Sequence, residues 1–378
     1  MKKCLLVLLA LALLLSCAAC GKTADEDQPE AAEEAAAAEE SAEQEDELYV
    51  AMLTDIGSID DQSFNQACWD GMVQFAEEFG VEYAYYRPAN HGVDALTAAI
   101  TSAADEGVDV LVCPGSLFES VICDLQYEYP EISFLLIDGE PHPANSTAVD
   151  IAANVHCIVY QEEQAGFLAG YAAVTEGLTK LGFVGGMEVP AVTRYGYGFI
   201  QGADYAAQKA KSQVVINYWY SGSFDPSDEV YQTCRQWYGS GTQAIFACGG
   251  NLFTSVLQAA DEADDRYMIG VDVDQAALSA SIITSAMKDL QGTTYTALCA
   301  LMDNQWQWPD DYAGQTAHLG AADQAAGLPT AADSWRFKTF TQENYEELLN
   351  AVIDGSVTVS DSIAGLPETT NTTVNVME

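Results

Sequence analysis

The chain has 378 residues, a length that suits about two domains, and its 57 Asp+Glu against 13 Lys+Arg give a formal net charge of −44. About −35 of this charge falls on residues 48–378, which hold only ten basic residues. Such an acidic surface disfavours nucleic acid, anionic lipid headgroups and strongly anionic ligands, so a neutral or cationic ligand is expected.

The chain begins with a segment that is typical of protein export. Residues 1–20, MKKCLLVLLALALLLSCAAC, join two lysines to an apolar run that is too short for a stable membrane span, followed by small residues and a cysteine. We interpret them as a lipoprotein signal peptide with Cys20 as the lipidated residue. Cys17 is the alternative lipidation site, and an ordinary cleaved signal peptide is the competing interpretation. The mature protein is therefore expected to be extracytoplasmic and lipid-anchored at the cell membrane.

Residues 21–47 are dominated by alanine and acidic residues and contain no aromatic residue. They have no apolar face that a helix could bury, and their like charges repel one another. We predict an acidic, disordered tether between the lipid and the folded part of the chain.

From residue 48 onward, short apolar runs alternate with amphipathic stretches. Near-continuous apolar strands between helices are typical of parallel sheets that are covered on both faces. Two doubly wound domains of five or six strands fit the length better than one sheet of about ten strands. The predicted strands lie at 48–53, 82–86, 108–115, 132–139, 156–160, 180–186, 214–220, 243–250 and 266–274, and the predicted helices at about 64–79, 93–105, 117–129, 161–175, 194–210, 227–237 and 252–263.

In open parallel sheets, ligands bind beyond the carboxyl ends of the strands, so the residues after each strand are the candidates for a site. Asp55 follows the first strand, and Ser63 with Gln66 forms an S-x-x-Q pattern that predicts a capping box. That box would place Phe64 and Asn65 in the first helical turn, beside backbone N–H groups that point out of the helix. A position in the core is the competing interpretation for Phe64. The aspartates at 60–61 suit a helix start as well as a ligand contact.

Later strand ends supply further candidates. The stretches KLGFVGG and FACGG end in paired glycines, Gly249 among them, which let the backbone approach a ligand or close a tight turn. Phe224 and Asp272 each follow an apolar strand. Lys288 is one of the few cations in the folded part, and a surface salt bridge competes with ligand contact as its role.

These residue types favour binding over catalysis. Aromatic faces can sandwich a flat ring, each contact contributing about 1–3 kcal/mol, and carboxylates accept the paired hydroxyl hydrogens that a ribose offers. The sequence contains neither G-x-G-x-x-G nor G-x-x-x-x-G-K-[ST], so dinucleotide and nucleoside triphosphate binding are unsupported. The D-V-D of GVDVDQ resembles the motif of phosphoaspartyl hydrolases, but it lacks the following Thr or Val and the cations that such chemistry needs. We therefore predict no enzyme, no metal site and no cofactor.

Seven cysteines remain beyond Cys20. Their odd number, and the position of several inside apolar runs, argue against a disulfide framework, although one disulfide stays open. They are Cys68, Cys113, Cys123, Cys157, Cys234, Cys248 and Cys299.

Nine stretches together resemble the basic membrane protein family of lipoproteins, close to its purine nucleoside receptors, which are substrate-binding proteins of ABC transporters. The resemblance implies an α/β type I periplasmic-binding-protein fold, with two doubly wound parallel-sheet lobes joined by a three-crossing hinge. Lobe 1 would comprise 48–156 with about 286–318, and lobe 2 would comprise 157–285 with about 319–378. The stretches are TDIGSIDDQSFNQACWDG, YPEISFLLIDG, EEQAGFLAGYAA, KLGFVGG, YGYGFIQGA, YSGSFDP, IFACGG, IGVDVDQ and TSAMK.

The resemblance also implies a nucleoside, often a purine nucleoside, held between the lobes. Matched by motif, Phe64 and Phe224 would stack on the base from opposite lobes. The base edge and the ribose would be held by Asn65, Asp55, Asp272 and Lys288. Where relatives carry F-A-D, this chain has Phe118-Glu119-Ser120. Either Glu119 replaces that aspartate one position early, or the base preference differs.

The implied partners are an ABC permease and its ATPase, with the membrane reached through the lipid anchor, and a monomer is expected. Two alternatives remain open. A receptor of the same fold for a sugar or a sugar-like signal would bind free ribose or galactose without a base. A signalling or adhesion lipoprotein that has lost transport would have no permease genes beside its own.

Overall fold

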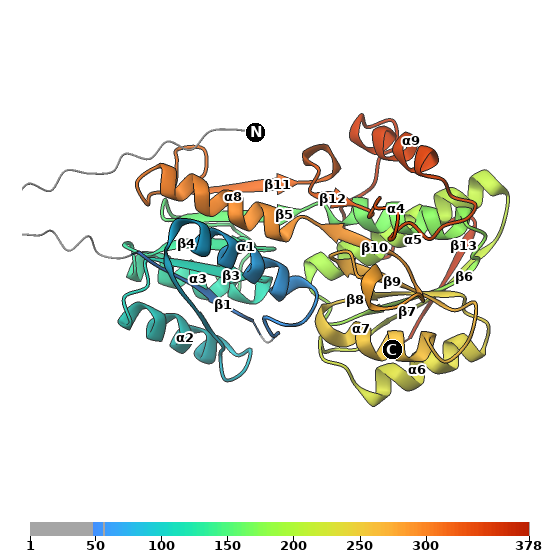
Figure 1. The fold of residues 1–378 in the computed structure, drawn as a ribbon, viewed down its shortest axis with the longest axis horizontal. Helices are drawn as coiled ribbons and strands as arrows, with labels where there is room; N and C mark the ends of the chain where they lie inside the picture. The colour runs from blue at the N-terminus through green and yellow to red at the C-terminus, as the bar shows by residue number, and fades with distance from the viewer. Residues whose placement is uncertain (1–47, 56, 378) are drawn as a thin grey trace, which may run out of the picture. The chain divides into compact units, whose positions relative to one another are not determined.

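The computed structural model describes residues 48–55 and 57–377. The predicted signal peptide, the predicted tether and the lipidation site at Cys20 lie outside these residues. The described part contains two sheets, each covered by helices on both faces, and its strands are nearly all parallel (Figure 1). It therefore has the α/β fold with two sheet lobes that the sequence predicts.

The six-stranded sheet, which we call lobe 1 together with its helices, has the strand order β11-β5-β4-β3-β1-β2. Neighbouring residues of β1 point to opposite faces: Val50 and Met52 pack with α1 and α8, whereas Ala51 and Leu53 pack with α2 and α3. The strands are β1 Tyr49–Leu53, β2 Glu82–Tyr86, β3 Val110–Pro114, β4 Ser133–Ile137, β5 Val155–Tyr160 and β11 Gln315–Leu319, and the helices are α1 Phe64–Phe79, α2 Val93–Asp105, α3 Glu119–Glu128 and α8 Leu290–Asp303.

The seven-stranded sheet, lobe 2, has the order β12-β10-β9-β8-β6-β7-β13, with β12 antiparallel to β10. Phe183 of β6 packs with α4 and α5 on one face, and Val184 packs with α6 and α7 on the other. The strands are β6 Lys180–Gly185, β7 Val214–Tyr220, β8 Ala244–Cys248, β9 Tyr267–Asp272, β10 Ile282–Lys288, β12 Ala326–Gly327 and β13 Thr372–Val376, and the helices are α4 Glu162–Thr175, α5 Pro190–Ala210, α6 Asp228–Gly239, α7 Phe253–Ala260 and α9 Gln342–Ile353.

The chain passes between the two sheets three times, after β5, after β10 and after β11. The chain therefore leaves one sheet for the other after Tyr160, Lys288 and Leu319. The lobe boundaries expected from the sequence fall shortly before these residues. The sequence predicts the strands up to β9, whereas β10 to β13, α8 and α9 were not predicted as separate elements.

The start of α1 differs from the predicted capping box. Ser63 is the N-cap residue, but its hydroxyl makes no capping bond. The Asp61 carboxylate accepts the backbone N–H groups of Ser63 at 2.9 Å, Asn65 at 3.1 Å and Gln66 at 3.1 Å, so it satisfies the donors at this helix end. The Gln66 side chain accepts from Gln62 N at 2.9 Å instead of reaching back to Ser63.

Helices α4 and α5 pack backbone against backbone because both carry Gly-x-x-x-Gly. A Cβ atom on Gly166 would lie 2.2 Å from the Tyr195 carbonyl oxygen, and one on Gly198 would lie 2.1 Å from the carbonyl oxygen of Glu163. Any side chain at these positions would force the helices apart. The glycines of EEQAGFLAGYAA and YGYGFIQGA thereby bring the charged ends of α4 and α5 close to β10.

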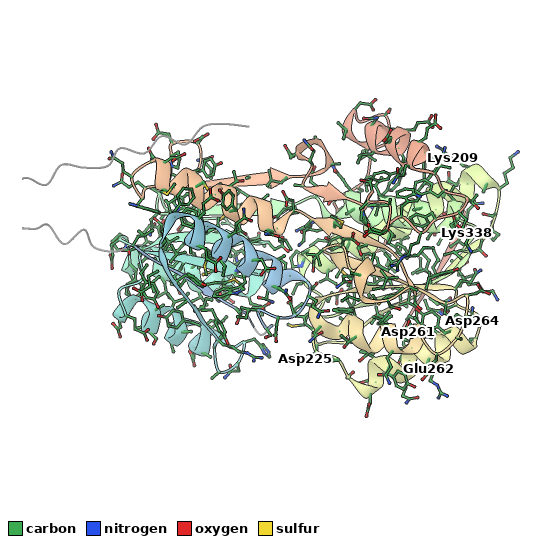
Figure 2. The ribbon with its side chains drawn as sticks, in the orientation of Figure 1. Lys209, Asp225, Asp261, Glu262, Asp264 and Lys338 are labelled. Atoms are coloured by element: carbon green, nitrogen blue, oxygen red, sulfur yellow. The ribbon has the colours of Figure 1, made fainter. Side chains whose placement is uncertain are left out.

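Charged side chains lie mostly on the outside of the fold. Figure 2 labels three exposed acids of lobe 2 (Asp261, Glu262 and Asp264) together with the exposed Lys209 of α5. The seven cysteines of the described part are unpaired, and six of them are buried. Among the residues that the structure describes, no helix combines the length and the apolar character needed to cross a membrane.

Candidate ligand-binding site

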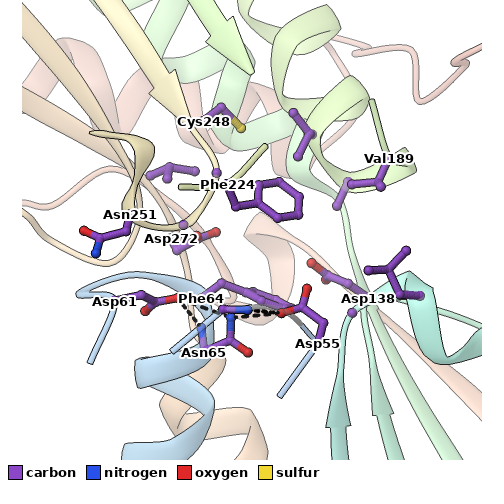
Figure 3. Close-up of a pocket in the computed structure, with 18 of the residues that line it drawn as sticks. Asp55, Asp61, Phe64, Asn65, Asp138, Val189, Phe224, Cys248, Asn251 and Asp272 are labelled. Carbon is purple, nitrogen blue, oxygen red and sulfur yellow. Dashed lines mark hydrogen bonds between the residues drawn. The ribbon is translucent and has the colours of Figure 1, made fainter. Parts of the chain in front are cut away.

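A pocket of about 910 Å³, counting the part open to solvent, lies between the two lobes at the carboxyl ends of their strands (Figure 3). Lobe 1 contributes the loop after β1, the start of α1 and the residues after β2, β3 and β4. Lobe 2 contributes residues after β7 and β8, the last residues of β8, β9 and β10, and the start of α5. Residue 56 of the β1 loop lies outside the described residues.

Two phenylalanine rings from opposite lobes bound the pocket. Phe64 is the first residue of α1, and Phe224 lies in the loop after β7; Figure 3 shows the two rings on opposite sides of the space. Phe224 rests on glycine backbone: a Cβ on Gly186 would lie 2.2 Å from its Cδ1 atom, and one on Gly249 would lie 2.7 Å away. The paired glycines after β6 and β8 therefore make room for this ring, and Gly249, at φ +136°, has a backbone that other residues rarely adopt.

A carboxylate–amide group lines the lobe 1 side. Asn65 Nδ2 lies 3.4 Å from Asp55 Oδ1 and 3.3 Å from Asp61 Oδ2, and it donates to both. Asn65 Oδ1 is buried and has no hydrogen-bond partner among the described residues. Burial raises the pKa of Asp61 to about 6, although the backbone N–H groups that it accepts lower it. The group therefore presents acceptors that suit hydrogen-bond donors of a ligand.

Lys288, the last residue of β10, is buried at one side of the pocket beside three buried carboxylates, those of Asp138, Glu162 and Asp272. Lys288 Nζ donates to Asp138 Oδ2 and lies 3.4 Å from Glu162 Oε1 and 3.9 Å from Asp272 Oδ1. Its Nζ atom also lies 4.8 Å from the centre of the Phe64 ring. Burial alone lowers the pKa of Lys288, but the carboxylates outweigh it and raise that pKa above the ordinary value, so Lys288 stays charged.

The carboxylates of this cluster differ in their environment. Burial, together with the nearby Glu162, raises the pKa of Asp138 to about 7, although Lys288 lowers it. Burial also raises the pKa of Asp272, which Lys288 and the Ser63 hydroxyl oppose. Arg194 Nε donates to Glu162 at 2.5 Å and, with Lys288, outweighs burial and leaves the pKa of Glu162 below its ordinary value. Asp138 Oδ1 is buried without a hydrogen-bond partner among the described residues, so a hydroxyl donor can bind there.

The structure brings most of the predicted site residues together. The pocket is lined by Asp55, Phe64, Asn65, Phe224, Gly249, Asp272 and Lys288. Glu119 is not among the lining residues: it lies 3.2 Å from His142 Nε2 and accepts the backbone N–H of Glu140 at 3.1 Å. Glu119 therefore takes part in a contact within lobe 1 that the sequence pattern did not indicate.

Several lining residues were not predicted from the sequence, among them Asp138, Arg87, Tyr195 and Cys248. Asp138 directly follows β4, so the strand-end argument applied to Asp55 and Asp272 would have found it. Arg87 directly follows β2 in the same way. Tyr195 is a buried residue inside α5, and Cys248 ends the buried strand β8, so no signal in the sequence distinguishes them from core residues.

Known proteins resemble the chain over most of its length. An ABC transporter nucleoside-binding protein BmpA of Lactococcus lactis is 28% identical over 241 residues, which are 61% of this chain and 65% of that protein. Basic membrane protein B of Borrelia garinii is 29% identical over 287 residues, 75% of this chain and 81% of that protein. An uncharacterized lipoprotein of Pyrococcus furiosus is 26% identical over 310 residues, 79% of this chain and 74% of that protein.

The fold is also found in a solved structure of an ABC transporter solute-binding protein from Aeropyrum pernix. That structure matches with a TM-score of 0.72 at 22% identity, over 83% of this chain and 94% of the other. The family model of PnrA-like ABC transporter substrate-binding proteins matches residues 48–360, which include all the pocket residues named above. The chain therefore belongs to the Bmp family of PnrA-like ABC transporter substrate-binding proteins, a family of binding proteins and not an enzyme class.

Proposed function

We propose that this protein is a lipid-anchored receptor that traps a nucleoside, most simply a purine nucleoside, between its two lobes and delivers it to an ABC permease. The observation that carries the proposal is the pair of Phe64 and Phe224, which face each other across a pocket otherwise rich in carboxylates. A flat base fits between two aromatic faces, and each stacking contact contributes about 1–3 kcal/mol.

The polar groups suggest how such a ligand would lie. Ribose hydroxyls are donors that suit Asp138 and Asp272, whose carboxylates are held beside the charged Lys288. The base would then extend between the rings, with one edge toward Asn65 and Asp55. Closing the lobes around it would exclude water and strengthen these few polar contacts.

The nucleoside-binding name of the lactococcal relative supports the choice of ligand, and the lipoprotein name of the Pyrococcus relative supports the anchor. We place the lipid on Cys20, with the ABC permease and ATPase as partners and a monomer as the working state. Mass spectrometry of the mature N-terminus would test the anchor, since lipid on Cys17 would give a chain three residues longer.

Isothermal titration tests the ligand. The protein, refolded to remove carried-over ligand, would be titrated with inosine, guanosine, adenosine, cytidine, uridine, adenine and ribose. Sub-micromolar binding of at least one nucleoside without a response to ribose is the expected result, and Phe64→Ala should weaken it at least tenfold because one stacking face is lost. Binding of ribose alone would indicate a sugar receptor instead. No binding of any of these compounds would contradict the assignment of a nucleoside ligand.

A further inference from the structure

Two hydrogen bonds join the lobes directly beside the pocket. Ser63 Oγ donates to Asp272 Oδ2 at 2.6 Å, and Gln275 Nε2 donates to the carbonyl oxygen of Gln62 at 3.0 Å. Gln62 and Ser63 immediately precede α1 of lobe 1, whereas Asp272 and Gln275 end or follow β9 of lobe 2. We call these two bonds the interlobe contact. Of its four residues, only Asp272 lines the pocket.

Both sides of the interlobe contact are held in place from within their own lobe. In lobe 1, Ser63 N donates to Asp61 and Gln62 N donates to Gln66. In lobe 2, Gln275 Oε1 accepts Val271 N at 3.2 Å, which orients the amide so that its NH₂ group faces Gln62.

The lobe 2 side is fixed further by the Gln275 backbone, whose N–H donates to Ser285 Oγ at 3.1 Å. Gln62 and Asp272 both have left-handed backbones, with φ of 53° and 66°, a conformation that non-glycine residues adopt only when their surroundings hold it. The two surfaces are thus prepared in advance, so little conformational freedom is lost when they meet.

Resting on the proposed function, we infer that Ser63 and Gln275 are positioning residues that set ligand affinity by stabilising closure, without touching the ligand. The interlobe contact joins protein to protein, so any movement that separates the lobes breaks it whichever ligand is bound. The measured dissociation constant scales inversely with the population of the binding-competent state. Removing either bond must therefore weaken the binding of every nucleoside by the same factor. Substitution of a residue that contacts the base would instead change the order of preference among nucleosides.

Gln275→Glu tests the inference with a nearly isosteric change. The carboxylate keeps the acceptor for Val271 N but has no hydrogen to donate to the carbonyl of Gln62. The matched control is Gln201→Glu, since Gln201 also uses both ends of its amide, donating to Ser360 O at 2.9 Å and accepting Ser360 N at 2.8 Å, away from the interlobe contact. Titration of the purified full-length proteins with inosine, guanosine and adenosine would give the affinities, and stopped-flow dissociation the off-rates.

We expect Gln275→Glu to raise the dissociation constant about tenfold for each nucleoside, equivalent to about 1.4 kcal/mol, chiefly through faster dissociation. Ser63→Ala should act in the same direction, and Ser63→Thr, which keeps a hydroxyl, should restore the affinity. The control should bind like the wild type. An unchanged dissociation constant in Gln275→Glu, or a loss confined to one base, would overturn the inference.

A readout without ligand separates this inference from the proposed function. Hydrogen–deuterium exchange of the unliganded proteins should show faster exchange of residues 57–66 in Gln275→Glu than in Gln201→Glu, because the interlobe contact covers this segment. Equal exchange in the two variants contradicts the inference even if nucleosides bind. Faster exchange in a protein that binds no nucleoside would preserve the interlobe contact and refute only the ligand assignment.

Discussion

Replacing Lys288 by methionine removes a positive charge that lies within 4 Å of all three carboxylates, those of Asp138, Glu162 and Asp272, and leaves Arg194 beside Glu162 alone. The lysine is 4% exposed, and Asp138 and Asp272 are 7% and 4% exposed, so water in the pocket replaces its charge only in part. Methionine has a similar length and keeps the apolar contacts of the side-chain stem. Breaking a buried ion pair by removing one partner costs about 3–5 kcal/mol, since the remaining charge is left uncompensated. We expect Lys288→Met to lower the free energy of unfolding by this amount near pH 8.

The loss of unfolding free energy in Lys288→Met should be smaller at lower pH, because Asp138 is then protonated. Its pKa in the folded wild type is about 7, against 3.8 for an exposed aspartate, so the folded state keeps a proton that the unfolded state releases. Wild-type stability therefore falls as pH rises toward 7 and then levels off. Lys288 lowers this pKa, so in the variant Asp138 keeps its proton to higher pH. The free energy of unfolding of the variant therefore continues to fall above pH 7. One proton changes stability by about 1.4 kcal/mol per pH unit, so the deficit of the variant should widen by about 1.4 kcal/mol from pH 6 to pH 8.

Urea unfolding of both proteins at pH 6, 7 and 8 measures this difference. The control is Lys209→Met: Lys209 is exposed, with its Nζ 4.4 Å from the centre of the Tyr205 ring (Figure 2), so its loss should cost at most about 1 kcal/mol without dependence on pH in this range. A Lys288→Met deficit below 1 kcal/mol, or one that is the same at pH 6 and pH 8, would refute the reasoning.

Two further predictions concern the pocket and one concerns the packing of lobe 2. Asp272→Ala should weaken nucleoside binding at least tenfold in isothermal titration, because a buried carboxylate acceptor is lost; a wild-type-like titration would contradict this role. Gly186→Ala should also weaken binding at least tenfold, because its Cβ would lie 2.2 Å from Phe224 and displace the ring, and retention of full affinity would argue against ring placement as the role of that glycine. Gly198→Ala should lower the unfolding free energy by about 2 kcal/mol or more through overpacking. Gly239→Ala, whose Cβ meets nothing within 4 Å, should leave stability equal or higher by up to about 1 kcal/mol, and equal effects of these last two changes would contradict the close packing of α4 and α5.

Much of the pocket can be predicted from the sequence because ligands of parallel sheets bind beyond the carboxyl ends of the strands. The carboxyl ends of the strands lie at one edge of each sheet, and the two lobes face each other across the pocket at these edges. Asp55 of lobe 1 therefore shares the pocket with Asp272 and Lys288 of lobe 2, although more than 200 residues separate the first from the last two. The same geometry applies to Asp138, which was missed because the run LLIDG was read as strand to its end.

Features that depend on contacts distant in sequence could not be predicted. The local S-x-x-Q pattern predicts that Ser63 caps its own helix, but an acceptor 209 residues away, Asp272, takes the hydroxyl, and Asp61 caps the helix instead. Glu119 likewise contacts His142 and not the pocket. The late strands β11 and β13, with sequences QTAHL and TTVNV, are too polar to show the apolar run of a buried strand, and only their pairing with β5 and β7 identifies them.

The three passages of the chain between the sheets also determine the order in which the two lobes can finish folding as the chain is made. Strand β11 covers the edge of β5, and the apolar face of α1 packs against α8, yet about 155 residues separate the end of β5 from β11. At about 5–20 residues per second, a chain that emerges N-terminus first presents the β5 edge for about 8 to 31 seconds before β11 exists. The Phe75 face of α1 waits longer, since about 210 residues separate α1 from α8. Lobe 1 therefore cannot finish folding before most of lobe 2 has been made, and the half-made chain is a natural client for a chaperone that shields apolar surface until residue 319 is delivered.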